Sequence, residues 1–268
     1  LFNRATGLNV LLDEVPIPVS LHAHAPRQVS IALTNLCDLT CAHCYAPKSR
    51  DELRFDTIVR WLAELDAHGT LGVGFGGGEP TLYPDFVRLC NYLARETQLS
   101  VSFTTNGHHI DDVLVEGLRG NVNFVRVSMD GVGATYESIR HRSFDDLLSR
   151  LKHVQSLSPF GINVVINTFT LPDLNEVAIV AEDFGACELL LLPQVSVRGV
   201  PTISADSLQG LRLWVDSYRG RLKLCINELS AEGFSTCDPL MQESGLRTYA
   251  HIDATGVLRW TFPALVDR

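Results

Sequence analysis

The sequence predicts an α/β fold in which helices cover a parallel β-sheet. Two observations support this prediction. Short apolar segments of strand length alternate with segments of helical periodicity from residue 28 to about residue 193, and a predicted helix separates each strand from the next. Such strict alternation is typical of parallel sheets, because a parallel connection needs a crossover segment. A chain of 268 residues is long enough for one large domain of this kind with small additions.

Six strands are predicted in this alternating region. The first shows the pattern clearly, since Val29, Ile31 and Leu33 are apolar residues in alternate positions. Other strands are apolar on both faces in places, as expected for strands that helices cover. Pro193 ends the sixth strand. The expected strands span residues 28–35, 71–75, 100–104, 124–129, 162–168 and 189–192.

The predicted helices are recognised from apolar residues three and four positions apart. In the first helix, Ile58, Leu62 and Leu65 lie on one side, and Pro84 opens the second because proline is favoured at helix starts. The pattern changes after residue 204, where one helix, one strand and a terminal hairpin are expected. The helices span residues 55–67, 84–96, 111–118, 144–156, 175–184 and 208–218; the last strand spans 222–226, and the hairpin pairs 249–252 with 257–262.

The composition excludes several classes of function. A net charge of −9 makes sequence-independent binding of nucleic acid unfavourable. No run of about 18 apolar residues occurs, so no transmembrane helix is predicted. Residues 1–27 contain charged residues and prolines and lack the apolar core of a signal peptide. We therefore expect a cytoplasmic protein with no nucleic-acid or membrane partner.

Three of the seven cysteines, Cys37, Cys41 and Cys44, lie within eight residues after the first strand. Thiolates are soft ligands for zinc or iron–sulfur clusters. A structural zinc ion normally has four ligands, and His43 could complete such a set. A four-iron cluster held by three cysteines would leave one iron open for chemistry. Unlinked buried thiols are the third interpretation, and the residues alone leave all three open.

The pattern Cys37-x3-Cys41-x2-Cys44, followed by Tyr45, closely resembles the cluster loop of radical S-adenosylmethionine (radical SAM) enzymes. The resemblance implies a partial (β/α)6 TIM-like barrel with a short α+β C-terminal cap. It also implies one [4Fe–4S] cluster on the three cysteines and S-adenosylmethionine (SAM) bound at the open iron. In that family, reductive cleavage of SAM gives a 5′-deoxyadenosyl radical that abstracts a hydrogen atom from the substrate.

Further motifs at the ends of the predicted strands resemble the SAM pocket of the same family. Gly77-Gly78-Glu79 matches the motif that meets the SAM ammonium group, and Arg140 resembles an arginine that pairs with the SAM carboxylate, with Arg142 as a competitor. Ordinary turns are the alternative for most of these positions. The residues that the resemblance assigns to SAM are Tyr45, Gly77, Gly78, Glu79, Thr105, Asn106, Ser128, Asp130, Arg140, Asn167 and Leu192.

The C-terminal part resembles the peptide-modifying branch with a SPASM or shorter twitch extension, in a reduced form. A cysteine that usually follows the hairpin glycine is replaced by Thr261, so we expect a single cluster. Cys225 and Cys237 are candidate hydrogen-atom donors to a substrate radical. We expect an extended segment at residues 1–27, a radical SAM core at 28–200 and a twitch-like cap at 201–268.

The resemblance implies a ribosomal precursor peptide as the substrate, altered by cross-linking, epimerisation or another modification of a C–H bond. A flavodoxin- or ferredoxin-like protein is the expected electron donor. Two alternatives stay open. One is a radical SAM enzyme that acts on a sugar, nucleoside or amino acid, and the other is a non-catalytic zinc- or cluster-binding module.

Overall fold

The structure, a computed structural model, describes residues 2–4, 24–236 and 245–259. Each of the six strands predicted for the core is present, with its ends within two residues of the predicted positions. The strands are β1 (Gln28–Thr34), β2 (Gly72–Gly77), β3 (Ser100–Thr105), β4 (Phe124–Ser128), β5 (Phe160–Ile166), β6 (Glu188–Pro193), β7 (Lys223–Ile226), β8 (Tyr249–Ile252) and β9 (Leu258–Arg259).

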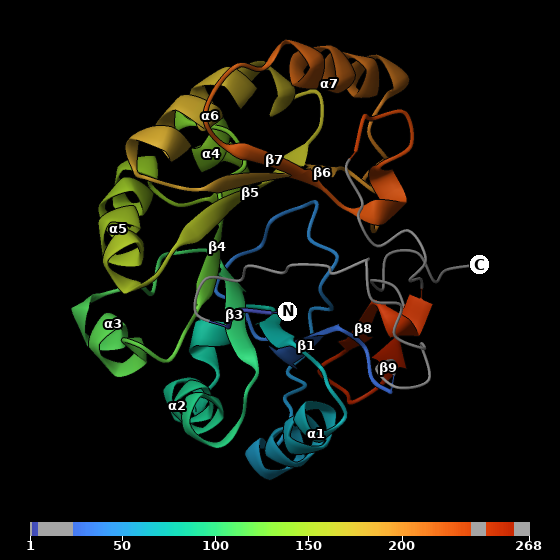
Figure 1. Cartoon of the computed structure of the whole chain (residues 1–268). Helices are drawn as coiled ribbons and strands as arrows, with labels where there is room; N and C mark the ends of the chain where they lie inside the picture. The colour runs from blue at the N-terminus through green and yellow to red at the C-terminus, as the bar shows by residue number, and fades with distance from the viewer. Residues whose placement is uncertain (1, 5–23, 237–244, 260–268) are drawn as a thin grey trace.

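These strands form one nine-stranded sheet in the order β7-β6-β5-β4-β3-β2-β1-β8-β9. Neighbouring strands are parallel except for the antiparallel pair β8 and β9. The sheet curls into an arc with the helices on its outer side (Figure 1). Within the described residues its edges are β7 and β9, so the arc does not close, and the predicted partial barrel is confirmed.

The helices agree with the sequence pattern, with one exception. Helix α4 was not expected, because it is short and lies between the glycine-rich end of β4 and a left-handed turn at His141 (φ 55°). The helices are α1 (Phe55–Ala67), α2 (Phe86–Glu96), α3 (Asp112–Leu118), α4 (Gly133–Arg140), α5 (Phe144–Leu157), α6 (Leu174–Asp183) and α7 (Ala205–Ser217), with 3₁₀ turns at Pro80–Leu82, Leu171–Asp173, Glu228–Ser230 and Gly245–Arg247.

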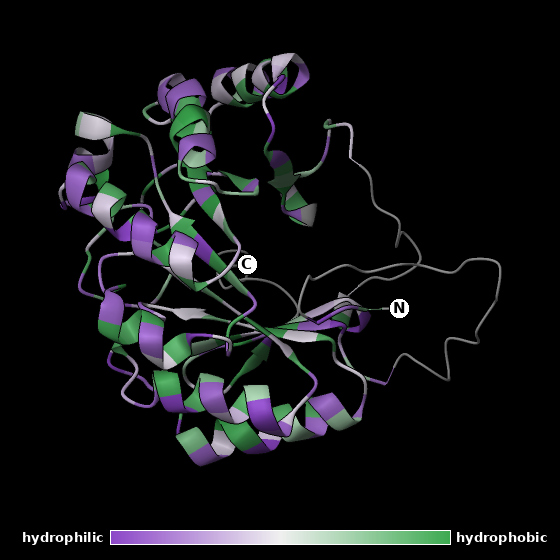
Figure 2. Cartoon of the chain, turned by 60° about the vertical axis from the view of Figure 1, so that its left-hand side comes forward, coloured by the Kyte–Doolittle hydropathy of each residue, from purple (hydrophilic) through white to green (hydrophobic). Residues whose placement is uncertain are grey.

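The hydrophobic core lies between the outer face of the sheet and the helices. Figure 2 shows apolar and hydrophilic residues alternating along the helices, and buried apolar residues such as Leu62 of α1 and Leu89 of α2 belong to this core. Phe86 of α2 packs edge-on against Phe75 of β2 and Phe103 of β3, with ring centroids 6.3 and 5.1 Å apart. Because side chains alternate along a strand, the residues between these point to the inner face of the arc.

On β1–β3 the inner face carries small or polar side chains. Ser30, Gly74 and Ser102 stand in register across β1, β2 and β3. On the other side of the arc, Arg126 of β4 forms an ion pair with Glu188 of β6. The inner-face side chains at this register of β1–β3 are therefore smaller than those of Arg126 and Glu188.

The C-terminal strands belong to the same sheet as the core. β7 extends the sheet beyond β6, and β8 pairs with β1, where His251 stands opposite Ser30. The expected hairpin is confirmed for Tyr249–Ile252 and Leu258–Arg259, and residues 260–262 of its expected second strand lie outside the described residues. The hairpin lies along the core and adds to the sheet edge. No described helix is long and apolar enough to span a bilayer. The division of the chain at residues 27 and 200 stays a prediction.

Candidate functional site

The chemistry-bearing loops follow the carboxyl ends of the parallel strands, which lie along one edge of the sheet. The cysteine loop, residues 35–53, follows β1, and the glycine loop, residues 76–79, ends β2. Other loops follow β3, β4, β5 and β6. In α/β folds, this edge is where ligands bind.

Cys37, Cys41 and Cys44 lie on the cysteine loop, where Cys41 is buried and the other two are half-buried. The Cys44 amide donates a hydrogen bond to the Cys41 carbonyl at 3.2 Å. Burial raises the pKa of the Cys37 and Cys41 thiols, so a metal must displace their protons on binding. Tyr45 is 43% exposed.

His43 does not join the cysteines as a fourth ligand. Its Nε2 lies 3.2 Å from Oδ2 of Asp130, at the end of β4. Among the described residues, no three His, Cys, Asp or Glu side chains converge as ligands of one metal ion do. Cysteines that hold a four-iron cluster bind separate irons and need no such convergence.

The glycine loop is joined directly to the cysteine loop. Amides of Gly78 and Glu79 donate hydrogen bonds to the carbonyls of Thr34 at 2.7 Å and Leu36 at 2.8 Å. A Cβ atom on Gly78 would lie 2.1 Å from the Leu36 carbonyl oxygen, so only glycine permits this approach. A Cβ atom on Gly76 would instead meet nothing within 4 Å. The backbone at Gly76 therefore borders free space.

Glu79 is a buried hub between the glycine loop and the end of β3. Its Oε1 accepts hydrogen bonds from the hydroxyls of Thr81 at 2.7 Å and Thr105 at 2.8 Å, and from the Thr81 amide at 3.2 Å. Its Oε2 accepts from the Asn106 amide at 2.7 Å. Burial raises the pKa of Glu79, and these four donors oppose that rise. The carboxylate therefore holds the Thr105-Asn106 turn in place. Glu79 is also one of the residues expected to contact SAM.

Asp130 and Arg140 form a buried ion pair beside the cysteine loop. Arg140 Nη2 lies 2.5 Å from Asp130 Oδ2, and Asp130 Oδ1 accepts from the Val165 amide at 2.7 Å. Burial alone would raise the pKa of Asp130, but Arg140 and His43 hold it well below its usual range. The sequence singled out Asp130 and Arg140 separately, and the structure shows that they are partners.

Among the described residues, two buried polar atoms near this edge have neither a hydrogen-bond partner nor an ion-pair partner. They are Nε of Arg140 and Oδ1 of Asn163, which stands beside Ser128 in the register of β4 and β5. Buried polar atoms are nearly always paired, so unpaired ones indicate a polar ligand. Together with the free space at Gly76 and the three thiols, they fit a site for an iron–sulfur cluster and SAM.

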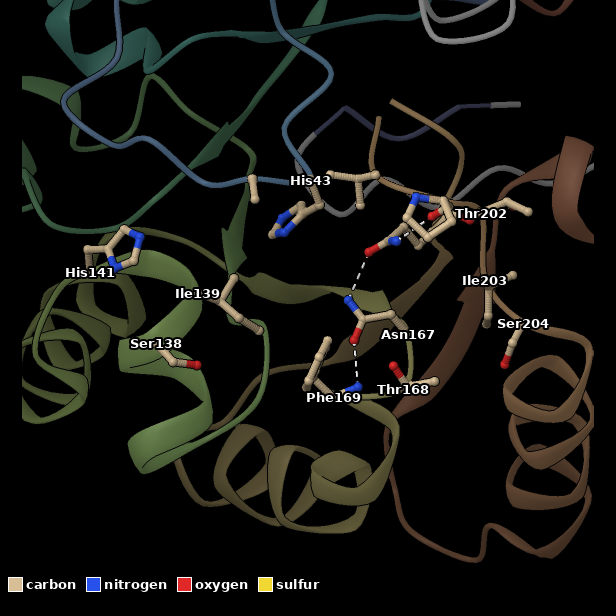
Figure 3. A pocket seen from close by; sticks show the side chains of 14 residues that line it. His43, Ser138, Ile139, His141, Asn167, Thr168, Phe169, Thr202, Ile203 and Ser204 are labelled. Atoms are coloured by element: carbon tan, nitrogen blue, oxygen red, sulfur yellow. Dashed lines mark hydrogen bonds between the residues drawn. The ribbon is translucent and has the colours of Figure 1, made fainter. Parts of the chain in front are cut away.

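A pocket of about 410 Å³ opens next to His43 (Figure 3). This volume is in the usual range for small-molecule sites. Asn167 lies on its wall and donates a hydrogen bond to the Gln194 side chain at 2.9 Å. The other lining residues come from the cysteine loop, α4 and the segments after β5 and β6: Ala42, Ser138, Ile139, His141, Thr168, Phe169, Val200, Pro201, Thr202, Ile203 and Ser204.

Of the eleven residues that the resemblance assigns to SAM, one lines this pocket and the other ten do not. Asn167 lines it, whereas Leu192 does not, and Gln194 takes part in its place. Gln194 comes directly after the strand-ending Pro193 and was not singled out from the sequence. Cys225 lies on β7, with its Sγ 3.9 Å from Oε2 of Glu188. Cys237 lies outside the described residues.

A family model described as the radical SAM superfamily matches residues 31–181. Two curated relatives are 30% identical to the chain. The sporulation killing factor maturation protein SkfB of Bacillus subtilis strain 168 aligns over 193 residues, which are 69% of this chain and 47% of SkfB. Mycofactocin maturase MftC of Mycobacterium tuberculosis strain H37Rv aligns over 237 residues, 83% of this chain and 58% of MftC. The chain thus spans about half the length of these relatives.

Streptococcus suis SuiB, solved with its precursor peptide SuiA, is similar in fold. The TM-score is 0.76 with 19% sequence identity, and the alignment covers 93% of this chain and 63% of SuiB. The likeness supports the observed arrangement of strands and helices.

Proposed function

The chain belongs to the radical SAM superfamily, and we propose that it uses one [4Fe–4S] cluster and SAM to modify a C–H bond of a ribosomal precursor peptide. The observation that carries the proposal is the set of three thiols on one loop, next to the Glu79 hub and the Asp130–Arg140 pair. When bound, the cluster and SAM together supply a 5′-deoxyadenosyl radical that abstracts a hydrogen atom.

In this proposal Cys37, Cys41 and Cys44 hold the cluster. The glycine loop offers backbone carbonyls to the SAM ammonium group, and Glu79 keeps that loop and the Thr105-Asn106 turn in place. Arg140 has an unpaired Nε for the SAM carboxylate while Asp130 fixes the other end of its guanidinium. Ser128, Tyr45, Asn167 and Leu192 complete the assigned positions.

The choice of a peptide substrate is supported by the relatives. SkfB is a maturation protein, MftC is a maturase, and SuiB has been solved bound to its precursor peptide SuiA. In this proposal a substrate segment lies along the inner face of the sheet, where Ser30, Gly74 and Ser102 are small. The modification itself is a cross-link, an epimerisation or another change at carbon.

We extend the proposal to the surroundings of the reaction. All six described cysteines are free thiols, as expected in the reducing cytoplasm. A flavodoxin- or ferredoxin-like protein supplies the electron. Cys225, on β7, donates its thiol hydrogen atom to a carbon radical of the substrate, and the resulting thiyl radical takes one electron from the same donor and one proton from water. Cys237 is the second candidate for this donation.

The decisive experiment is anaerobic reconstitution of the full chain with iron and sulfide, followed by SAM and dithionite. We expect about one cluster per chain and formation of 5′-deoxyadenosine and methionine, measured by liquid chromatography and mass spectrometry. The triple variant of Cys37, Cys41 and Cys44 to alanine should lose both, and Cys187→Ala, at an exposed thiol away from the loop, should lose neither.

Tightly bound zinc without 5′-deoxyadenosine in the wild type, or cleavage retained in the triple variant, would overturn the cluster assignment. The peptide assignment is tested by co-expression with a short peptide encoded beside the gene. A change in the peptide's mass that depends on the three cysteines supports it. An unchanged peptide, together with a modified sugar, nucleoside or amino acid, would replace it by the small-molecule alternative.

A further inference from the structure

The cysteine loop is held mainly by side chains. Between residues 37 and 50, the only backbone–backbone hydrogen bond among described residues joins Cys44 to Cys41. The backbone contacts to Leu36 and Asp51 lie at the ends of the loop. A loop with so few backbone hydrogen bonds is free to open locally unless other contacts hold it. Side-chain contacts must therefore fix the positions of the three thiols.

Asp38, which directly follows Cys37, makes the most such contacts. Its Oδ1 accepts a hydrogen bond from Nδ2 of Asn106 at 2.9 Å. Its Oδ2 accepts from Nη2 of Arg142 at 3.0 Å and lies 3.1 Å from Nε2 of His109. The Asp38 carbonyl also accepts from Arg142 at 3.4 Å. One residue thus gathers three side chains from two other loops.

The partners of Asp38 are themselves anchored. The Asn106 amide is bound to Glu79, and the Asn106 Oδ1 accepts from the His108 amide at 3.0 Å. Arg142 follows α4, directly after the left-handed turn at His141 that directs the chain from α4 to α5. Its backbone is thus part of the corner between α4 and α5, and its guanidinium connects this corner to Asp38 on the cysteine loop.

We propose that Asp38 is a positioning residue that fixes Cys37 relative to the end of β3 and the corner between α4 and α5, with Asn106 and Arg142 as its anchors. The inference rests on the proposed function, because a cluster is the group that needs Cys37 fixed. Asp38 and Arg142 also carry opposite charges beside the cluster loop. Because reduction adds negative charge to the cluster, Asp38 lowers its midpoint potential and Arg142 raises it.

The test compares Asp38→Ala, Asp38→Asn and Arg142→Gln in the full chain after anaerobic reconstitution. Arg119→Gln is the matched control, because Arg119 forms an exposed pair with Glu116 at 3.3 Å, near the end of α3. The measured quantities are iron and sulfide per chain, the EPR spectrum of the reduced cluster, and its midpoint potential. The iron and sulfide content and the EPR spectrum report the positioning of the cluster ligands, and the midpoint potential reports the effect of the nearby charges.

We expect Asp38→Ala to lower the iron content severalfold. Asp38→Asn keeps an acceptor for Asn106, so it should restore most of the cluster and shift its midpoint potential to a more positive value. Arg142→Gln should shift the potential to a more negative value, and Arg119→Gln should match the wild type. Two shifts of opposite sign distinguish this role from a general loosening of the fold, which would move both potentials in one direction.

A second measurement does not depend on the cluster. Thermal unfolding of the cluster-free chain should show non-additive decreases in Tm for Asp38→Asn, Arg142→Gln and the double variant, because the two residues contact each other. A wild type without a cluster overturns the proposed function and this inference together. Wild-type iron content in Asp38→Ala, potentials that shift in the same direction, or additive Tm changes would overturn the inference alone.

Discussion

The guanidinium of Arg140 lies 2.5 Å from the carboxylate of Asp130, and the two side chains are 11% and 1% exposed. This pair joins α4 to the end of β4, and through Val165 it also reaches β5. Breaking a buried pair on one side leaves an uncompensated charge, which costs more than the pair contributes. The site and the stability of the fold are therefore linked at this position.

Asp130→Asn should lower the free energy of unfolding by about 3–5 kcal/mol, because Arg140 stays charged and loses its partner. Urea denaturation followed by circular dichroism measures the change. Glu116→Gln, which breaks the exposed pair with Arg119, should cost about 1 kcal/mol or less. Equal losses of unfolding free energy in the two variants would show that burial of the Asp130–Arg140 pair does not make its loss more costly than that of an exposed pair.

Glu79→Gln should lower both the stability of the fold and the affinity for SAM, although glutamine has nearly the same shape as glutamate. Four donors converge on the Glu79 carboxylate, and an amide replaces one of its oxygens with a further donor. We expect a loss of about 1–3 kcal/mol in unfolding free energy and weaker binding of SAM, measured by denaturation and equilibrium dialysis. Thr81→Val removes only the hydroxyl donor of Thr81 and should have a smaller effect. A Glu79→Gln protein as stable as the wild type would contradict the role of Glu79 as a hub.

Two alanine substitutions in the glycine loop should have different consequences. In Gly78→Ala the new Cβ would lie 2.1 Å from the Leu36 carbonyl, so the two loops must separate and cluster content should fall. In Gly76→Ala the new Cβ meets no protein atom within 4 Å, so the melting temperature should be unchanged while SAM affinity decreases. Iron content, Tm and SAM dialysis distinguish the two variants. Normal SAM binding in Gly76→Ala would place the cofactor elsewhere.

Stability should rise with pH between about 4 and 6.5 because of His251. Burial lowers the pKa of His251 to about 4, with Arg259 acting in the same direction and Asp253 against it. In this range the unfolded chain binds a proton that the folded chain excludes, so stability rises by roughly 1.4 kcal/mol per pH unit. Burial also lowers the pKa of His108, which adds a dependence of the same sign.

The measurement is the unfolding free energy of wild type and His251→Gln at several pH values in that range. The variant should show a clearly smaller slope than the wild type. An unchanged slope in His251→Gln would mean that the imidazole takes up its proton in the folded chain as readily as in the unfolded one.

The periodicity of buried residues was sufficient to predict the six core strands and most helices, because each strand is covered on its outer face by helices. It did not predict α4, whose eight residues carry a weak apolar pattern between glycines and the turn at His141. It also did not predict the pairing of β1 with β8. Ser30 and His251 are 221 positions apart, and nothing local in either segment specifies the other.

The candidate site was predictable to the extent that its chemistry lies in short motifs. The spacing of the three cysteines and the glycines of residues 76–78 identified two of its loops directly. The pairing of Asp130 with Arg140, and of Asp38 with Arg142, was not predictable, because it depends on which strand ends the curved sheet brings together. Gln194 was missed for the same reason, since its partner Asn167 lies on another strand's loop.

The pairing of β1 with β8 has a consequence for synthesis on the ribosome. β1 is translated before the other described strands of this sheet, yet its second neighbour, β8, follows more than 200 positions later. During that interval one side of β1 exposes unpaired amides and carbonyls, a feature that promotes association between nascent chains. We expect the nascent protein to depend on chaperones until residues 249–252 have left the exit tunnel and the native ladder forms.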